Sequence, residues 1–169
     1  MNEDHFLEQE DWIEKVGDIA VEYTSLFIVP CDHSVSPYES FYRDTLTVDA
    51  SAADSPYFQP APMPCGMKGF ICGTSTVAVL KYYRENGFEM ESAFHDLPDH
   101  VACELEFLGR LYQAQDVEVA QKFFEEHFGR WIFTFLNGLE KQNHSIFYQR
   151  SAMSLKKFLM FECSTVSSL

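Results

Sequence analysis

The sequence predicts an all-α fold, a helical bundle formed by one domain over residues 1–169. Apolar residues recur at spacings of three, four and seven along most of the chain, as in amphipathic helices. No stretch shows the alternation of apolar and polar residues that is typical of a half-buried strand. The chain is 46% hydrophobic with 16 Phe and 8 Tyr, enough to fill a core. We therefore expect packed helices without a significant sheet.

The first expected helix covers about residues 4–29. Its apolar stripe consists of Phe6, Ile13, Val16, Ala20, Tyr23 and Phe27. A second helix should begin at "SPYESFYRDTL", where Ser36 can act as the N-cap and Pro37 suits the first helical position. Glu39 follows Ser36 by three residues and would complete a capping box.

Residues 47–73 should form no regular helix. Four prolines fall between Pro56 and Pro64, and glycines follow at 66, 69 and 73. A segment of this length inside a compact domain indicates a functional loop or a hinge, and the sequence leaves both open.

Two further helices should follow the loop. Thr74 or Ser75 would cap the first, over "TSTVAVLKYYRENGF", and Gly87 would end it. The second lies in "HDLPDHVACELEFLGRLY", with Asp96 as N-cap and with Pro98 and Asp99 in the first turn, where a carboxylate favours the helix dipole. Its expected core stripe is Val101, Leu105, Leu108 and Tyr112.

The C-terminal third predicts three more helices. One covers about residues 117–128 and ends before Gly129, and "RWIFTFLNGLEKQ" forms the next. "SIFYQRSAMSLKKFLMFEC" forms the last, and the polar tail at 164–169 should fray. The residues of the 117–128 region expected to be buried are Val119, Ala120, Phe123, Phe124 and Phe128.

Charge and cysteine usage restrict the class of partner. The net charge is −14, from 26 acidic and 12 basic residues. Such a chain is repelled by nucleic acids and anionic membranes and attracts basic peptides, although an acidic surface also serves solubility alone. The five cysteines show no knuckle spacing and suit a reducing compartment. Without an apolar span or a secretory signal at its start, the chain is expected in the cytoplasm, with no nucleic acid and no membrane insertion.

The sequence offers only weak metal and catalytic sites. His95, His100 and Glu104 could bind zinc in a hydrolase, but the histidines are five residues apart with a helix start between them. Cys31, His33, Cys65 and Cys72 could also gather around zinc, with irregular spacing. "CGMKGFICGTST" does not match the order of a phosphate loop, and no nucleophile elbow is present. We expect no cofactor, with the hydrolase as the alternative.

Five motifs, in order, resemble the TorD/DmsD/NarJ-like chaperones: "SPYESFYRDTL", "LKYYRENGFEM", "LPDHVACELEFLGRLY", "AQKFFEEHFGRWIFTFLNGL" and "IFYQRSAMSLKKFL". The resemblance covers roughly residues 37–159, with a gap over the proline-rich loop. Its most specific piece is a Pro-Asp-His helix start followed by a glutamate, here Pro98, Asp99, His100 and Glu104. The aromatic cluster of Tyr38, Phe41 and Tyr42 matches the family's other marked helix.

The resemblance implies a cytoplasmic chaperone with the TorD-like bundle and no enzymatic activity. It implies binding of the twin-arginine signal peptide, or of the catalytic subunit, of a molybdenum-cofactor oxidoreductase, which is held until its cofactor is inserted. Either a monomer or a domain-swapped dimer is compatible with it. An adaptor that binds a folded subunit without a leader remains an alternative.

A leader of this kind is basic and apolar, so its groove needs carboxylates and aromatic walls. The expected carboxylates are Asp99, Glu104 and Glu39. The expected walls are Tyr38, Phe41, Tyr42 and Phe107, with Pro98 and His100 at the helix start. Core packing of the aromatics, a dipole role for Asp99 and a structural His100–Glu104 pair are the competing explanations.

Overall fold

The computed structural model describes the secondary structure of most of the chain. The described residues are 16–29, 31, 33–45, 69, 71–90, 96–142 and 145–166, with side chains up to residue 161. Every regular element among them is helical, and one isolated antiparallel bridge joins Tyr38 to His100. The predicted all-α class is confirmed.

Contacts between Cα atoms divide the chain into two compact units. One is Pro37–Thr134, and the other joins Met1–Ser36 to Phe135–Leu169. The single-domain organisation stays a prediction. Most of the proline-rich loop, residues 46–68 and 70, lies outside the described residues.

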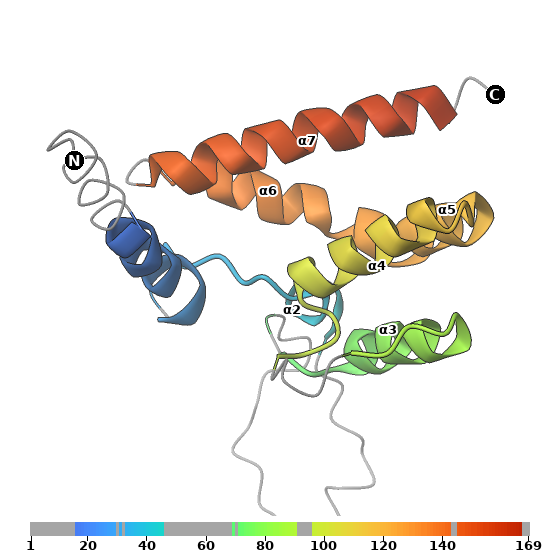
Figure 1. Cartoon of the computed structure of the whole chain (residues 1–169). Helices are drawn as coiled ribbons and strands as arrows, with labels where there is room; N and C mark the ends of the chain where they lie inside the picture. The colour runs from blue at the N-terminus through green and yellow to red at the C-terminus, as the bar shows by residue number, and fades with distance from the viewer. Residues whose placement is uncertain are drawn as a thin grey trace, which may run out of the picture. The chain divides into compact units, whose positions relative to one another are not determined.

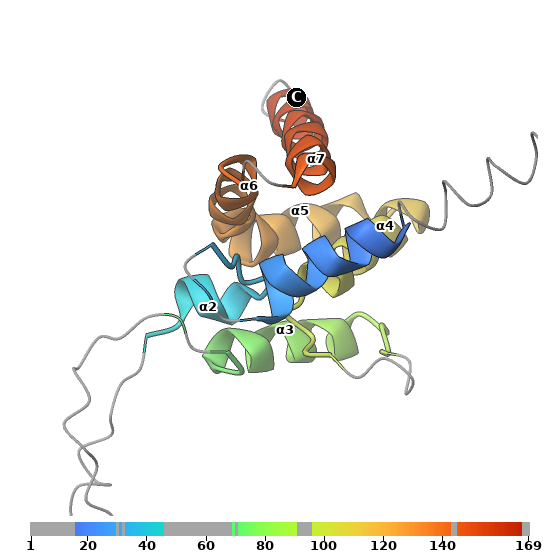
Figure 2. The same ribbon diagram turned by 90° about the vertical axis from the view of Figure 1, so that its left-hand side faces the viewer.

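The unit Pro37–Thr134 contains α2 (Glu39–Arg43), α3 (Thr74–Glu85), α4 (Val101–Gln113), α5 (Val117–Glu126) and the 3₁₀ turn η3 (Phe128–Arg130). The helix α6 (Ile132–Glu140) begins at its end. Figure 1 shows α3 running alongside α4 and α5, and the view in Figure 2 agrees. An aromatic cluster fills the space between these helices. Phe107 lies at its centre, with ring centroids 4.7 Å from Tyr83, 4.9 Å from Phe123 and 5.3 Å from Phe88.

The carboxylate of Asp44 caps α3 from a distant part of the chain. Its oxygens accept hydrogen bonds from the Ser75 amide at 3.0 Å, the Ser75 hydroxyl at 2.6 Å and the Thr74 hydroxyl at 3.1 Å. The N-cap residue itself is Gly73, so the prediction that Thr74 or Ser75 caps the helix was wrong. A methyl group on Gly73 would collide with the Asp44 carboxylate. At the other end the structure agrees with the sequence, because Gly87 follows the helix with φ +69°.

The start and the buried face of α4 differ from the prediction. Its N-cap is His100 instead of Asp96. The buried residues are Cys103, Glu104, Phe107, Leu108 and Leu111, whereas the predicted stripe was centred one position away and included Tyr112, which is 48% exposed. The polar Glu104 sits within the buried stripe, so the apolar pattern alone placed the face incorrectly.

The start of α2 also differs. The helix begins at Glu39 with Tyr38 as an extended N-cap, so Ser36 and Glu39 do not form the predicted capping box. The reason is tertiary: residues 37–39 pair with the chain before α4, and the Glu39 side chain turns inward.

The second unit contains a helix at residues 16–23 that continues as the π-helix η1 (Thr24–Ile28), and also α7 (Ile146–Val166). Phe27 packs with ring centroids 5.2 Å from Tyr148 and 6.2 Å from Phe135. The predicted stripe does not form the buried face: Val16, Ala20 and Tyr23 are exposed and Phe27 is half-buried, whereas Leu26, outside that stripe, is fully buried. Its N-terminal part, residues 4–15, lies outside the described region.

The predicted break at Gly129 is present, because η3 separates α5 from α6. The last helix extends to Val166, into the tail that was expected to fray, and residues 167–169 lie outside the described part. Cys103 is a buried free thiol. None of the helices in the described residues combines the length and the apolar character needed to cross a bilayer.

Candidate binding site at the junction of α2 and α4

Main-chain hydrogen bonds join the starts of α2 and α4. The Val101 amide donates to the Pro37 carbonyl at 2.9 Å, and the Glu39 amide donates to the Asp99 carbonyl at 3.0 Å. Tyr38 and His100 form the bridge between these bonds, with their rings 5.3 Å apart. Residues that the sequence places about sixty positions apart are thereby held together.

His100 is fixed by both nitrogens of its ring. Nδ1 accepts a hydrogen bond from the Ala102 amide at 3.1 Å and so caps α4, while Nε2 lies 3.9 Å from Asp96 Oδ2. The Tyr38 hydroxyl donates to the other oxygen of Asp96 at 2.6 Å. Burial lowers the pKa of His100, and the negative charges of Asp96 and Asp99 oppose this shift. The neutral imidazole is the form that can accept from Ala102.

The side chain of Asp99 caps the start of α2. Its side chain is fully buried, and Oδ2 accepts a hydrogen bond from the Ser40 amide at 2.9 Å. This bond satisfies one of the first amides of a helix whose own N-cap residue makes no side-chain bond. Oδ1 has no hydrogen-bond partner among the described residues. The neighbouring Pro98 carbonyl accepts from the Tyr83 hydroxyl at 3.0 Å.

Glu39 is buried against a cation and an imidazole. His127 Nδ1 lies 3.3 Å from both carboxylate oxygens, and the Arg43 guanidinium pairs with the same group. Arg43 also donates to the Glu126 carbonyl at 2.9 Å. These contacts tie α2 to the end of α5.

Glu104 is, like Glu39 and Asp99, a fully buried acid of the site. Trp131 Nε1 donates to its Oε2 at 3.2 Å, while Oε1 has no partner in the described part of the chain. Burial raises the pKa of Glu104 well above its usual range, and the nearby charge of Glu39 adds to this increase. The Trp131 ring stacks on Tyr42 with centroids 5.5 Å apart, and burial raises the pKa of Tyr42.

The structure therefore brings most of the predicted site residues into one region, at different depths. Five are buried: Glu39, Asp99, His100, Glu104 and Phe107. Four are half-buried: Tyr38, Phe41, Tyr42 and Pro98. The half-buried set forms the aromatic rim of the junction, a name used below for Tyr38, Phe41, Tyr42 and Pro98. Phe107 lies in the aromatic core beneath it.

Three residues that contact the buried acids of the site were not predicted from the sequence: Arg43, His127 and Trp131. His127 carried the only usable signal, since it continues the apolar stripe of Ala120 and Phe123 at a spacing of four. A titratable side chain on a buried stripe indicates a buried polar partner.

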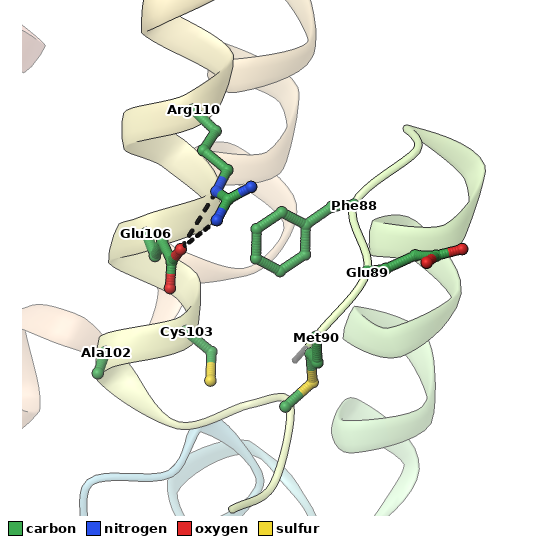
Figure 3. A pocket seen from close by; sticks show the side chains of 7 residues that line it. All are labelled: Phe88, Glu89, Met90, Ala102, Cys103, Glu106 and Arg110. Atoms are coloured by element: carbon green, nitrogen blue, oxygen red, sulfur yellow. Dashed lines mark hydrogen bonds and ion pairs between the residues drawn. The ribbon is translucent and has the colours of Figure 1, made fainter. Parts of the chain in front are cut away.

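A separate pocket of about 280 Å³ lies between α4 and the segment Phe88–Met90 that follows α3 (Figure 3). Its lining residues are Phe88, Glu89, Met90, Ala102, Cys103, Glu106 and Arg110, none of which belongs to the predicted site. The Arg110 guanidinium lies 5.1 Å from the centre of the Phe88 ring and pairs with Glu106 at 2.7 Å. Burial raises the pKa of the Cys103 thiol to about 12, so this sulfur is protonated near neutral pH.

The predicted alternative metal sites fall partly outside the described residues, which exclude His95 and Cys65. Within the described ranges no group of three or more His, Cys, Asp or Glu side chains is arranged to hold a metal ion. Cys31 Sγ and His33 Nε2 do lie 3.2 Å apart.

A family model and individual proteins of known name are similar to this chain. The family model of the nitrate reductase delta subunit matches residues 4–137. The chaperone protein TorD of Shewanella pealeana is 22% identical over 135 residues, covering 80% of this chain and 54% of that protein. A Tat proofreading chaperone DmsD of Haemophilus influenzae is 25% identical over 142 residues, covering 84% of this chain and 59% of the relative. The chain thus spans little more than half the length of these relatives.

A solved structure supports the fold. The crystal structure of a redox enzyme maturation protein from Archaeoglobus fulgidus aligns with a TM-score of 0.55 at 24% sequence identity, covering 86% of this chain and 67% of that one. It shares the helical architecture.

Proposed function

The chain belongs to the nitrate reductase delta subunit family, and from this premise we propose that it is a chaperone for the maturation of a molybdenum-cofactor oxidoreductase. It binds the precursor through the twin-arginine signal peptide, the catalytic subunit or both, and holds it for cofactor insertion before export or assembly. The names of its relatives, TorD and DmsD chaperones, support a binding role without catalysis.

The observation that carries this proposal is the junction of α2 and α4. This junction contains both the aromatic rim and three buried acidic side chains, on a chain with a net charge of −14. A leader with a basic region and an apolar segment matches both properties. Tyr38, Phe41 and Tyr42 offer ring surface for the apolar segment.

The carboxylates act from below the rim. Asp99 and Glu104 each keep one buried oxygen without a partner in the described residues. A buried acceptor without a partner costs roughly 1–3 kcal/mol. A guanidinium that reaches the junction would satisfy the Asp99 oxygen with a charge-assisted bond, whereas burial favours the neutral form of Glu104, which can offer only a neutral hydrogen bond. Glu39 is already paired with Arg43 and His127, so it positions α2. Phe107 packs against Tyr83, whose hydroxyl donates to the Pro98 carbonyl.

Calorimetric titration tests the proposal, using synthetic twin-arginine leaders of molybdoenzymes from the source genome and twin-lysine versions as controls. One leader should bind saturably, and its twin-lysine version should bind more weakly because lysine cannot make a bidentate pair. Asp99→Asn keeps the acceptor for Ser40 but removes the charge, and it should weaken binding about tenfold. His100→Ala should weaken binding as well.

The exposed variant Asp116→Ala serves as the matched charge control and should bind like wild type. Unchanged affinity in both site variants, with unchanged melting temperatures, would move the site elsewhere. If no leader binds but a leaderless catalytic subunit does, the adaptor function replaces the leader function.

We further propose a cytoplasmic location, because the leader must be met before export. Size-exclusion chromatography with light scattering will decide between the monomer and the domain-swapped dimer.

A further inference from the structure

The last helix, α7, has a buried inner apolar stripe and further apolar side chains that are exposed. Figure 1 shows it running along α6, and Lys156 Nζ fixes this contact by donating to Glu140 Oε2 at 2.8 Å and Asn137 Oδ1 at 2.6 Å. The inner stripe consists of Tyr148, Ala152, Leu155 and Leu159, at spacings of three and four. Ala152 and Leu159 are buried. This stripe accounts for the packing of the helix within its unit.

The other apolar side chains of α7 that the structure describes, up to Phe161, are exposed. We define the outer face of α7 by five of them and the two cations among them: Ile146, Phe147, Arg150, Met153, Lys157, Phe158 and Met160. Ile146, Met153 and Met160 recur every seven residues and are 61%, 45% and 59% exposed. At 100° per residue they lie about 140–180° around the helix from Leu155 and about 80–120° from Ala152, and the face extends for about 20 Å. An apolar stripe of this regularity is typical of a surface that packs against another helix.

The charge of the outer face has the opposite sign to that of the whole chain. From Ile146 to Phe161 there are three cations and no acid, although the chain carries −14 overall. Arg150 and Lys157 are exposed, and neither forms an ion pair with any described residue. They lie between the exposed apolar residues, one turn from Met153 on either side.

This combination selects one kind of occupant. A second copy of the outer face, packed antiparallel with its centre between Met153 and Ser154, would place Arg150 opposite Lys157, and like charges across an interface are unfavourable. A basic leader is repelled for the same reason. An anionic bilayer attracts the two cations but repels the remainder of so acidic a chain. An acidic helix satisfies both the apolar stripe and the cations.

We propose that the outer face of α7 is a docking surface for an acidic amphipathic helix of a partner protein. The apolar stripe of that helix packs on Ile146, Met153 and Met160, and its flanking carboxylates pair with Arg150 and Lys157. Methionine suits such a surface because its flexible side chain adapts to different shapes. The outer face shares no residue with the leader site, and this proposal does not depend on that site.

Fluorescence anisotropy with two designed helical peptides tests the proposal on the full chain. Both peptides carry one leucine stripe, flanked by glutamates in the first and by lysines in the second. The glutamate peptide should bind saturably, and at least about tenfold more tightly than the lysine peptide, because its carboxylates face two cations. The double variant Arg150→Glu/Lys157→Glu should reverse this preference.

Lys122→Glu on α5 is the matched control, since Lys122 is also exposed, and it should leave the preference unchanged. Met153→Ser should weaken binding of the glutamate peptide without altering the helical circular dichroism. The proposal is overturned if both peptides bind equally, if neither binds, or if charge reversal has no effect. It is also overturned if vesicles of phosphatidylglycerol bind the face in place of the peptide, or if Met153→Ser only abolishes a dimer. Leader titration of the same variants should be unchanged, which separates this test from that of the leader site.

Discussion

Burial controls the protonation of two residues at the junction. It raises the pKa of Glu104 and lowers that of His100, so both shifts favour the neutral form. The acid has one hydrogen-bond donor, Trp131, and the histidine must stay neutral to accept from Ala102. The two groups therefore make stability depend on pH in opposite directions.

Glu104→Gln should remove the pH dependence that Glu104 imposes. The folded-state pKa lies above the unfolded value, so the contribution of Glu104 is present at low pH and is lost as pH rises towards the folded pKa. Each pH unit within this window costs about 1.4 kcal/mol. Glutamine keeps an acceptor for Trp131 without ionising, so the variant should match wild type near pH 4 and melt at a higher temperature at pH 7–8. Thermal melts across this range measure the difference.

The exposed acid Glu106 on the same helix provides the control, because Glu106→Gln should not change the slope of melting temperature against pH. A Glu104→Gln protein that is strongly destabilised at every pH would show instead that the ionised carboxylate holds the site together.

His100 should make the free energy of unfolding depend on pH in the opposite direction. Its folded-state pKa lies below the unfolded value of about 6.5, so its contribution is present above that pH and is lost as pH falls. His100→Asn keeps a cap acceptor for Ala102 that cannot be protonated, and should flatten the loss between pH 7 and 5. His100→Ala should cost about 1 kcal/mol at neutral pH because the cap is lost. Urea titrations at both pH values distinguish the variants, and equal behaviour of Asn and Ala would refute the capping role.

At the scale of residues, local spacing predicted only part of the site. Pro98, Asp99, His100 and Glu104 are close in sequence, and their motif identified them together. Trp131 and His127 reach their partners over separations of 27 and 88 residues. No periodicity records such a contact, because it depends on how helices pack after they form.

At the scale of elements, helix existence was easier to predict than helix ends. Apolar periodicity identified α3 to α7. Gly87 marked the end of α3 because glycine adopts a positive φ without steric cost. The starts of α2 and α4 were wrong for a common reason: each is set by pairing with the other. Tertiary contacts replaced the local caps on which sequence analysis relies.

The start of α3 shows this replacement most clearly, and Asp44→Ala tests it. Asp44 accepts bonds from Thr74 and Ser75 across thirty residues of chain, and holds both ends of the proline-rich loop. Its loss should cost about 1–2 kcal/mol, in the range of a lost N-cap. Chemical denaturation measures the free energy of unfolding.

Asp116→Ala is the matched control for this variant, because Asp116 is the N-cap residue of α5 yet makes no side-chain cap bond. Its cost should be clearly smaller. Equal losses for the two variants would mean that Asp44 contributes only charge near a helix start.

At the scale of the whole molecule, the all-α class and the family followed from sequence because they depend on average properties and motif order. The charge distribution needed the structure. An acidic chain was expected to attract a basic peptide, but the cationic outer face of α7 appears only when the exposed side of that helix is known. The chain thus combines a net negative charge with a positively charged face on α7.

Salt provides the test of the leader site at this scale. A basic leader approaches a chain of net charge −14, so screening should weaken the attraction. The Debye length falls from about 10 Å at 0.1 M salt to about 3 Å at 1 M, which removes long-range attraction but leaves contacts with the aromatic rim. Affinity measured by calorimetry should therefore fall steeply at first and then level off, instead of vanishing. A leader with its arginines replaced by glutamine should show only the level part. If the native leader binds equally well from 0.05 to 1 M salt, aromatic packing alone holds it and the carboxylates beneath the rim have no role in recognition.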